Sequence, residues 1–189
     1  MYWESWENFC EQKVSQTLSK NFYWVTRPKQ RVTKTKKIMT RLFTIEKTPL
    51  DVVILSSCLQ NFSAGALVTF EGRVRNHNAG KEVSALEYEA HVSLAEKEGQ
   101  KILEEALLKF DILEAICVHR IGKLLLGEGA VWVGVISKHR KEAFRACEYI
   151  IDTVKHTLPI WKKEHYKDGE AVWVHCAACT QMDQRDHSV

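Results

Sequence analysis

The stretch that most constrains the fold of this chain is residues 131–164. Residues 131–136 form a continuous apolar run rich in β-branched side chains, which is typical of a strand covered on both faces. From Lys141 onward, apolar residues recur every three or four positions, a spacing that predicts a packed helix. Proline lacks an N–H group and disfavours helix at the preceding residue, so Pro159 should end this helix near Thr157. After it we expect a turn that carries Lys162 and Lys163. The expected apolar stripe of the helix is Ala143, Phe144, Cys147, Ile150, Ile151, Val154 and Leu158.

Basic residues stand at both ends of this predicted helix. His139 and Arg140 fall where the strand ends and the helix begins, and unpaired N–H groups and the helix dipole favour anions at such a junction. Lys155 comes just before the proline break and Lys162 just after it. These cations indicate either a solvated surface or an anion-binding site, and their spacing alone leaves both interpretations open.

A second informative stretch is residues 66–75, in which side chains alternate between two predicted faces. Arg73 and Arg75 share one face and come just before an Asn-His-Asn-Ala-Gly turn at residues 76–80. In isolation they would form an exposed basic strand face. Beside a second cationic site they would be suited to hold a phosphate. Residues 83–90 alternate again, so we expect a hairpin between them and residues 66–75.

The remaining pattern mixes strands and helices. A helix over 52–60 capped by Asp51, a helix over 92–110 and a glycine-bounded loop over 122–129 are expected. Further strands are expected over 41–46, 112–121 and 171–176. Hairpins interrupt any strict alternation of strand and helix, so the predicted class is α+β, with a mixed sheet and packed helices.

Charge and hydropathy limit the classes of function. No apolar run is long enough to span a bilayer and no signal-peptide pattern follows the first residue, so we expect a cytoplasmic protein with no membrane association. Residues 12–45 contain nine Lys or Arg and no acid, whereas residues 46–189 carry 18 basic and 21 acidic residues. The basic excess therefore does not make the main domain a nucleic-acid binder. A nucleic-acid-binding arm that stacks bases on Tyr23 and Trp24 remains the alternative for the N-terminal segment.

Three segments are expected along the chain. Residues 1–38 form an aromatic and basic extension, residues 39–180 the main domain, and residues 181–189 a tail. Cys117 and Cys147 fall within apolar patterns and are predicted to be small core residues. Cys176 and Cys179 have a metal-like spacing, but a single pair without a second is a weak signal, so no metal site is predicted.

The residues alone predict lysine-assisted chemistry on an anionic substrate. Arg73, Arg75, His139 and Arg140 would hold a phosphate or carboxylate. A lysine among other cations in a partly desolvated pocket has its pKa lowered, which brings it closer to acid–base use at neutral pH. The sequence shows no carboxylate pair placed for glycoside hydrolysis, no P-loop and no GxSxG motif.

Three strings of residues carry a resemblance to a known family. They are GALVTFEGRVRNHNAGKEVSALEYEA at 65–90, VHRIGKLLLGEGAVWVGV at 118–135, and HRKEAF at 139–144 followed by PIWKKE at 159–164. In this order and spacing they resemble the large, catalytic subunit of molybdopterin synthase, over about residues 40–176. The resemblance implies a fold like the α/β hammerhead.

The function that the resemblance implies is sulfur transfer in molybdenum cofactor biosynthesis. A small ubiquitin-like subunit would supply sulfur as a thiocarboxylate on its C-terminal glycine. Two transfers to cyclic pyranopterin monophosphate would form the dithiolene of molybdopterin, through a half-sulfurated intermediate. No metal or other cofactor is implied. The implied assembly is a heterotetramer, in which two large subunits form a dimer and a small subunit binds at each end.

The resemblance also implies roles for particular residues. The essential lysine matches Lys155 and the second important lysine matches Lys162, while Arg75, His139 and Arg140 match residues that bind the substrate anion. The same pocket segments contain Arg73, Val74, Lys163 and Glu164.

Two points qualify these implied roles. Many relatives carry an arginine shortly after the Trp-Val of the last strand, whereas Trp173-Val174 is followed here by His-Cys-Ala. The source of that contact across the dimer is therefore open. The alternative to an enzyme is a non-catalytic anion-binding module, whose signature would be a replaced Arg75 or Lys155, and neither is replaced.

Overall fold

The structure is a computed structural model, and it describes residues 43–175. The predicted extension 1–38, the boundaries at 38/39 and 180/181, the tail and the Cys176–Cys179 pair lie outside these residues. Within the described part of the chain, no helix has both the length and the apolar content that crossing a membrane requires.

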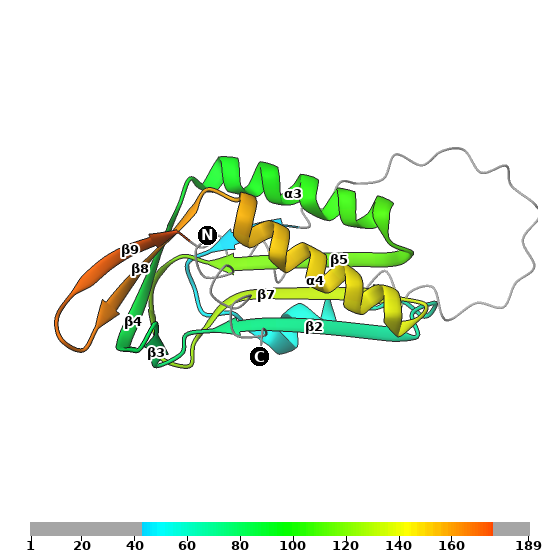
Figure 1. Cartoon of the computed structure of the whole chain (residues 1–189). Helices are drawn as coiled ribbons and strands as arrows, with labels where there is room; N and C mark the ends of the chain where they lie inside the picture. Colours follow the sequence, from blue (N-terminus) through cyan, green and yellow to red (C-terminus); the bar gives the residue numbers. More distant parts are fainter. Residues whose placement is uncertain (1–42, 176–189) are drawn as a thin grey trace, which may run out of the picture. The chain divides into compact units, whose positions relative to one another are not determined.

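The described domain contains two β-sheets, which Figure 1 shows side by side. The first has the order β1-β5-β7-β2, with β1 parallel to β5 and the other neighbours antiparallel; its strands are β1 (Phe43–Glu46), β5 (Ile112–Arg120), β7 (Gly129–Ser137) and β2 (Ala66–Arg73). The second is antiparallel, with the order β3-β4-β8-β9 and β6 paired to β4; its strands are β3 (His77–Asn78), β4 (Lys81–Ala90), β6 (Gly122–Leu125), β8 (Ile160–Tyr166) and β9 (Ala171–His175). The predicted α+β class is confirmed, with two sheets in place of the single mixed sheet that we expected.

Three helices complete the described domain: α2 (Val52–Ser57), α3 (Val92–Lys109) and α4 (Arg140–Thr157). Helices α3 and α4 lie next to each other on one face of the first sheet (Figure 1), and the main core lies between them and the strands. Asp51 caps α2 as predicted, since its carboxylate accepts from Val53 N at 2.9 Å and from Ile54 N at 3.0 Å. Gly99 of α3 lies against Phe43 of β1, where any Cβ would overlap the phenyl ring.

The strand and helix at the centre of the sequence are confirmed. Residues 131–136 are buried on both faces of β7, because α4 covers the face that carries Val131, Val133 and Val135 while Trp132 and Ile136 are buried on the other. Helix α4 ends at Thr157, as predicted. The next residue, Leu158, has an extended backbone and precedes Pro159. Phe144 is the exception in the predicted stripe, since 60% of its surface is exposed.

The predicted hairpin between residues 66–75 and 83–90 is wrong. Strand β2 pairs with β7, whereas β4 pairs with β3, β6 and β8. The ladder of β2 and β7 shifts register at Gly72/Arg73, after which the chain leaves the first sheet and enters the second. The segment expected as a loop over 122–129 likewise contains β6, which pairs with β4. Alternation predicted each strand, but it does not identify the partner of a strand.

The predicted turn after Pro159 is also wrong, because Lys162 and Lys163 lie within β8. Side chains of β8 alternate, so Lys162 and Glu164 are buried on one face while Trp161 and Lys163 lie on the other. A strand normally shows apolar residues on its buried face. Here that face carries a lysine and a glutamate, which concealed the strand pattern.

The tight turn between β3 and β4 offers a test of local strain. Ala79 and Gly80 join the paired residues Asn78 and Lys81, and both have positive φ, at 47° and 77°, as a two-residue type I′ turn requires. An alanine in the left-handed region costs about 1–2 kcal/mol, which asparagine partly avoids. Ala79→Asn should therefore raise the free energy of unfolding by about 0.5–1 kcal/mol in urea denaturation. Ala79→Val is the matched contrast and should lower it, because a β-branched side chain is more strained there. Equal stability of the two variants would contradict this account.

Candidate active site

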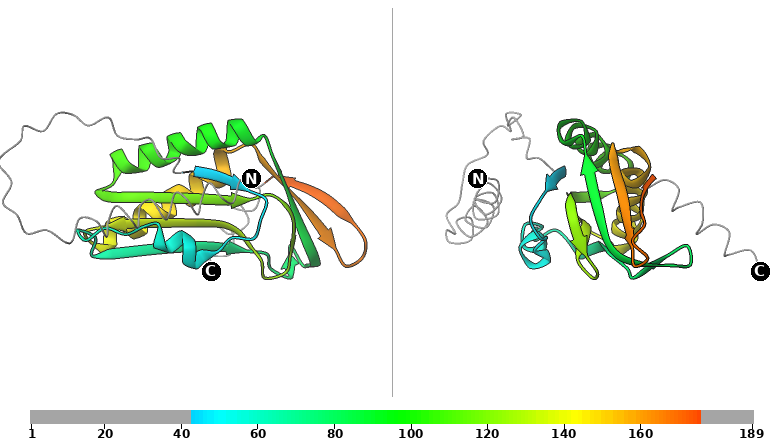
Figure 2. Two further views of the ribbon diagram at one scale, coloured as in Figure 1. Left: turned by 180° about the vertical axis from the view of Figure 1, so that it is seen from behind. Right: turned by 90° about the vertical axis from the view of Figure 1, so that its left-hand side faces the viewer.

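A pocket of about 350 Å³ lies where the second sheet meets the C-terminal half of α4 and the end of β2. The right-hand view of Figure 2 looks onto the end of the domain that carries the second sheet. The residues that line the pocket are Gly72, Arg73, Arg75, His77, Asn78, Val83, Leu86, Tyr88, Ala130, Val131, Asp152, Lys155, Lys162 and Glu164. Its size is within the usual range for a small-molecule site.

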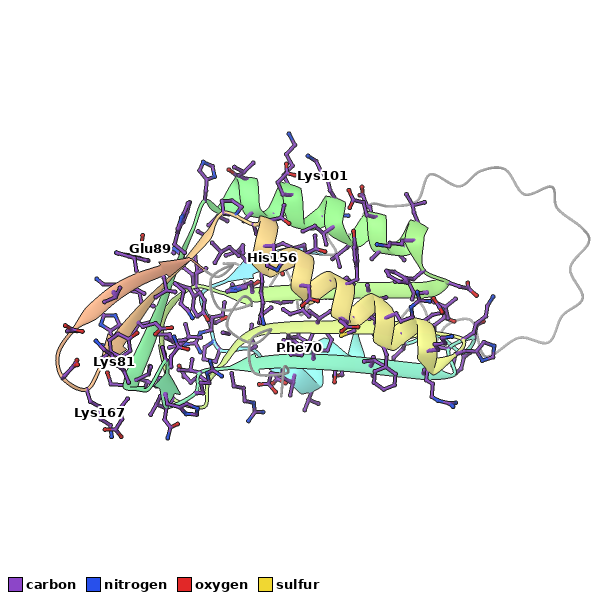
Figure 3. The ribbon with its side chains drawn as sticks, viewed as in Figure 1. Phe70, Lys81, Glu89, Lys101, His156 and Lys167 are labelled. Atoms are coloured by element: carbon purple, nitrogen blue, oxygen red, sulfur yellow. The ribbon has the colours of Figure 1, made fainter. Side chains whose placement is uncertain are left out.

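Two cations in this pocket have no carboxylate partner among residues 43–175. Arg75 donates from Nη2 to the neutral Oδ1 of Asn78 at 3.0 Å, and it forms no ion pair there. The Lys155 ammonium lies 5.7 Å from the centre of the Phe70 ring, and Figure 3 shows Phe70 between β2 and α4. A third cation, Arg73, instead donates to Glu71 at 2.8 Å. Arg75 and Lys155 therefore leave positive charge available to an anionic ligand.

Lys162 differs from Lys155, because its ammonium group is held by a buried carboxylate. Lys162 Nζ lies 2.8 Å from Glu164 Oε1, and the two residues are 8% and 1% exposed. Glu164 also accepts from Asn78 Nδ2 at 3.0 Å to each oxygen and from the Tyr166 hydroxyl at 2.6 Å. Burial by itself would raise the pKa of Glu164, but the hydrogen bonds from Lys162, Tyr166 and Asn78 hold it below its ordinary value. Glu164 is therefore a carboxylate at neutral pH.

The orientation of the Asn78 amide follows from its two neighbours. A guanidinium group only donates and a carboxylate only accepts. Oδ1 must therefore face Arg75, and Nδ2 must face Glu164. Asn78 thus links the exposed Arg75 to the buried pair of Glu164 and Lys162, with one possible assignment of its amide atoms.

Behind the pocket lies a buried histidine that the sequence did not single out. His119 Nδ1 lies 2.9 Å from the carbonyl oxygen of Arg120, and because a carbonyl only accepts, Nδ1 carries the proton. The ring packs edge-on against the pocket-lining Tyr88, with 5.1 Å between ring centres. Burial lowers the pKa of His119 to about 4; the hydrogen bond to Arg120 opposes this effect, and the charge of Lys155 adds to it. The imidazole is therefore neutral at pH 7.

The structure brings together some of the sequence-predicted site residues and separates others. Those that line the pocket are Arg73, Arg75, Lys155, Lys162 and Glu164. Val74 is buried in a small core cluster beside the pocket. Lys163 lies on the opposite face of β8 from Lys162, with its ammonium 5.4 Å from the centre of the Trp173 ring.

His139 and Arg140 lie at the other end of α4 from Lys155. His139 is the N-cap residue and Lys155 belongs to the last turn. At 1.5 Å per residue, the 15 steps from Arg140 to Lys155 span roughly 22 Å. Within one chain, the His139–Arg140 pair and the pocket are therefore two separate sites.

Sequence reasoning missed Asn78 and Tyr166 as members of the site. The sequence pattern indicates Asn78 only as a turn residue and assigns no role to Tyr166. The signal for Tyr166 was its spacing, since Lys162, Glu164 and Tyr166 share one face of a strand at steps of two. No comparable local signal indicates Asn78, because its bond to Glu164 spans 86 positions.

The arrangement can hold a small anion beside two lysines of different character. Lys155 is exposed to the pocket, whereas Lys162 is fixed by Glu164. Such a site is suited to bind a phosphate or carboxylate and to donate or accept protons next to it. Within residues 43–175 no group of three or more His, Cys, Asp or Glu side chains is placed to hold a metal ion.

Comparison with known proteins identifies the family of the chain. The family model described as "MoaE protein" matches residues 45–157. A Thermoplasma volcanium protein named molybdopterin synthase catalytic subunit is 45% identical over 125 residues, which cover 66% of this chain and 89% of the relative. A Nostoc protein of the same name is 39% identical over 143 residues, which cover 75% of this chain and 87% of the relative.

A solved structure agrees with these sequence matches. The crystal structure of molybdopterin synthase from Staphylococcus aureus includes a chain that matches with a TM-score of 0.67 and 38% identity, over 71% of this chain and 98% of that one. The family match covers more than half of the present sequence and includes β2, β4, β7 and α4, which line the pocket, whereas β8 follows the matched residues. The resemblance noted in the sequence is thereby confirmed, and the chain belongs to the MoaE family.

Proposed function

We propose that this chain is the catalytic subunit of a molybdopterin synthase, acting as a sulfurtransferase. It would transfer two sulfurs to cyclic pyranopterin monophosphate, one from each of two small ubiquitin-like subunits, and each C-terminal thiocarboxylate would be left as an ordinary carboxylate. The product would be the dithiolene of molybdopterin, formed in the cytoplasm as a step of molybdenum cofactor biosynthesis. Membership of the MoaE family and the catalytic-subunit names of its relatives support this assignment.

The observation that carries the proposal is the pair of uncompensated cations in the pocket. Arg75 and Lys155 line one cavity, and neither has a carboxylate partner among residues 43–175. A cyclic phosphate is an anion that such a pair would attract, and bidentate guanidinium contacts favour phosphate. A pocket of about 350 Å³ also has room for a small ring system next to the phosphate.

The two lysines take different roles in this proposal. Lys155, exposed in the pocket, is the residue placed to exchange protons with the reacting groups. Lys162 is held by Glu164 and supplies a fixed positive charge for the negative charge of the thiocarboxylate and of the substrate. No metal or other cofactor has a part in this scheme, since the sulfur arrives covalently bound.

His139 and Arg140 can contribute to the same anion only from a second copy of the chain. Roughly 22 Å of helix separates them from Lys155 in their own chain. We therefore propose the dimer of large subunits that the resemblance implies, in which this end of α4 would lie at the pocket of the neighbouring copy. Arg73, Val74 and Lys163 remain candidates for the substrate site, Arg73 as a contact and Val74 as support. Lys163 would act only if the small subunit approached the outer face of β8.

The proposal is tested by reconstitution of the reaction. The full chain is mixed with thiocarboxylated small subunit and cyclic pyranopterin monophosphate, and the pterin products are identified by mass spectrometry. The control is the same small subunit with an ordinary C-terminal carboxylate. We expect sulfurated pterin only with the thiocarboxylate. Failure with several small subunits known to be active with related enzymes would contradict the proposal.

Removal of the Arg75 guanidinium should weaken binding of the substrate phosphate. A charge-assisted hydrogen bond to an anion contributes about 1.5–3 kcal/mol, so Arg75→Ala should raise the Kd of cyclic pyranopterin monophosphate roughly ten- to a hundredfold in calorimetry. The matched control is Arg145→Ala, since Arg145 is exposed on α4 and paired with Glu142 outside the pocket. An unchanged Kd for Arg75→Ala would locate the anion site elsewhere.

A further inference from the structure

We propose that Tyr166 is a positioning residue of this pocket: its hydroxyl group fixes the Glu164 carboxylate and thereby the place of the Lys162 ammonium group. The inference rests on the proposed function, in which Lys162 takes part in sulfur transfer. Tyr166 itself does not line the pocket. It therefore acts through Glu164 and not on the substrate.

The donors around Glu164 are divided between its two oxygens. Oε1 lies 2.8 Å from Lys162 Nζ and accepts from Asn78 at 3.0 Å. Oε2 accepts from Asn78 at 3.0 Å and from the Tyr166 hydroxyl at 2.6 Å. Lys162 thus pairs with one oxygen while Tyr166 occupies the other. The rotation of the carboxylate group decides which oxygen faces the lysine, and so it decides where the ammonium lies.

The rotation of a glutamate carboxylate needs an external constraint. The last side-chain torsion of glutamate has a broad energy minimum, so the side chain itself does not fix it. Glu164 is 1% exposed, and solvent has little access to replace a lost donor. Without the Tyr166 hydroxyl, Oε2 would regain acceptor capacity, and the three N–H donors of Lys162 could bridge both oxygens. The ammonium would then be drawn toward β8 and away from the ligand.

The backbone and a neighbouring cation hold Tyr166 itself in place. Tyr166 follows Glu164 by two positions on β8, so both side chains lie on the same face. Its N–H donates to the carbonyl of Glu170 at 2.9 Å. The Lys81 ammonium lies 5.2 Å from the centre of the Tyr166 ring and 2.6 Å from a carboxylate oxygen of Glu170. Figure 3 shows Lys81 and Lys167 at the same end of the second sheet.

The hydroxyl of Tyr166 orients its partner without exchanging protons. Its hydrogen bond to Glu164, together with burial, raises the pKa of Tyr166 to about 12. Tyr166 is therefore a neutral donor at every pH at which the protein would work. The other titratable or charged groups that face the pocket from the surrounding elements are Arg73, Arg75, His77, Tyr88, Asp152 and Lys155.

The first test removes only the hydroxyl oxygen. Tyr166→Phe keeps the ring against Lys81 and should slow single-turnover sulfur transfer roughly tenfold at saturating substrate, with the Kd of the cyclic pterin within twofold of the parent value. The matched control is Tyr149→Phe, which removes a similar tyrosine–glutamate bond, 3.2 Å from Tyr149 to Glu105, on the exposed surface. A parental rate for Tyr166→Phe overturns the inference, and so does a defect confined to pterin binding.

A double-mutant cycle separates positioning from a direct contribution. Glu164→Gln should lower activity by itself, because it removes the charge that Tyr166 is proposed to orient. If Tyr166 acts only through Glu164, Tyr166→Phe should have no further effect in the Glu164→Gln background. The same tenfold loss in both backgrounds would show that Tyr166 acts independently of Glu164, contrary to the inference.

A third measurement does not depend on activity. The hydrogen bond from Tyr166 is one cause of the lowered pKa of Glu164, so a carbon-13 titration of the glutamate carboxyls should show a higher pKa for Glu164 in Tyr166→Phe. An unchanged titration in the folded variant overturns the inference. If the parent protein transfers no sulfur, the proposed function fails, and this titration still decides whether Tyr166 controls Glu164.

Discussion

Lys155→Arg is expected to bind both the cyclic pterin and the small subunit and yet to transfer sulfur roughly a thousandfold more slowly than the parent. Arginine keeps the positive charge in the pocket, so the attraction for an anion remains. A guanidinium group does not lose its proton near neutral pH, so it cannot alternate between acid and base. Positioned acid–base catalysis typically contributes a factor of about 10² to 10⁴. The measurement is a single-turnover reaction with thiocarboxylated partner in excess.

Three other variants distinguish proton transfer by Lys155 from the effect of its charge. Lys155→Ala should be at least as slow as Lys155→Arg, and it should also bind the anion less well. Lys162→Ala should keep a measurable residue of activity, because Lys162 is expected to contribute charge and not proton transfer. Lys101→Arg is the control, since Lys101 is exposed on α3 and paired with Glu98. A near-parental rate for Lys155→Arg would leave Lys155 a purely electrostatic role.

Acidification should destabilise the fold through His119, by about 3 kcal/mol between pH 7 and pH 4. Burial holds the pKa of His119 at about 4, compared with 6.5 for an ordinary histidine. Below pH 6.5 the unfolded chain therefore binds a proton that the folded chain does not. The contribution of neutral His119 to the free energy of unfolding is fully present above pH 6.5 and is lost as the pH falls toward 4. The measurement is urea denaturation of the parent across this range.

A matched pair of variants isolates this effect from the titration of carboxylates. His119→Asn retains a donor for the Arg120 carbonyl but cannot become charged. At pH 7 the free energy of unfolding of His119→Asn should be lower than that of the parent. Between pH 7 and pH 4, however, the variant should lose about 3 kcal/mol less than the parent loses. His156→Asn, at an exposed position of α4, should follow the parent. Parallel pH curves for the parent and His119→Asn would contradict the account.

The parts of the fold that the sequence predicted are those with a local cause. The apolar run of β7 and the three-to-four-residue spacing of α4 depend on neighbouring positions, and Pro159 ends the helix by its own chemistry. The fold class followed from the order of these elements. Strand partners did not follow, because β2 could pair equally well with any exposed strand edge.

The candidate site also combines residues that local patterns predict with contacts that only the folded structure shows. Arg75, Lys155 and Lys162 are candidates from their local pattern and from the resemblance to a family, and the structure places them in one pocket. The pairing of Lys162 with Glu164 depends on a strand whose buried face is charged, and apolar periodicity cannot reveal such a strand. The separation of Arg140 from Lys155 follows from the helix rise alone. Asn78 required the folded structure, because its partners come from different elements.

The most direct test of the proposed sulfur transfer follows the sulfur atom itself. A small subunit carrying a thiocarboxylate labelled with sulfur-34 is incubated with the full chain and cyclic pyranopterin monophosphate, and the pterin is analysed by mass spectrometry over time. We predict two labelled sulfurs in each product molecule, a transient species with one, and no labelled product with Lys155→Ala over the same period. Pterin that contains no labelled sulfur, or equal labelling with Lys155→Ala, would contradict the account.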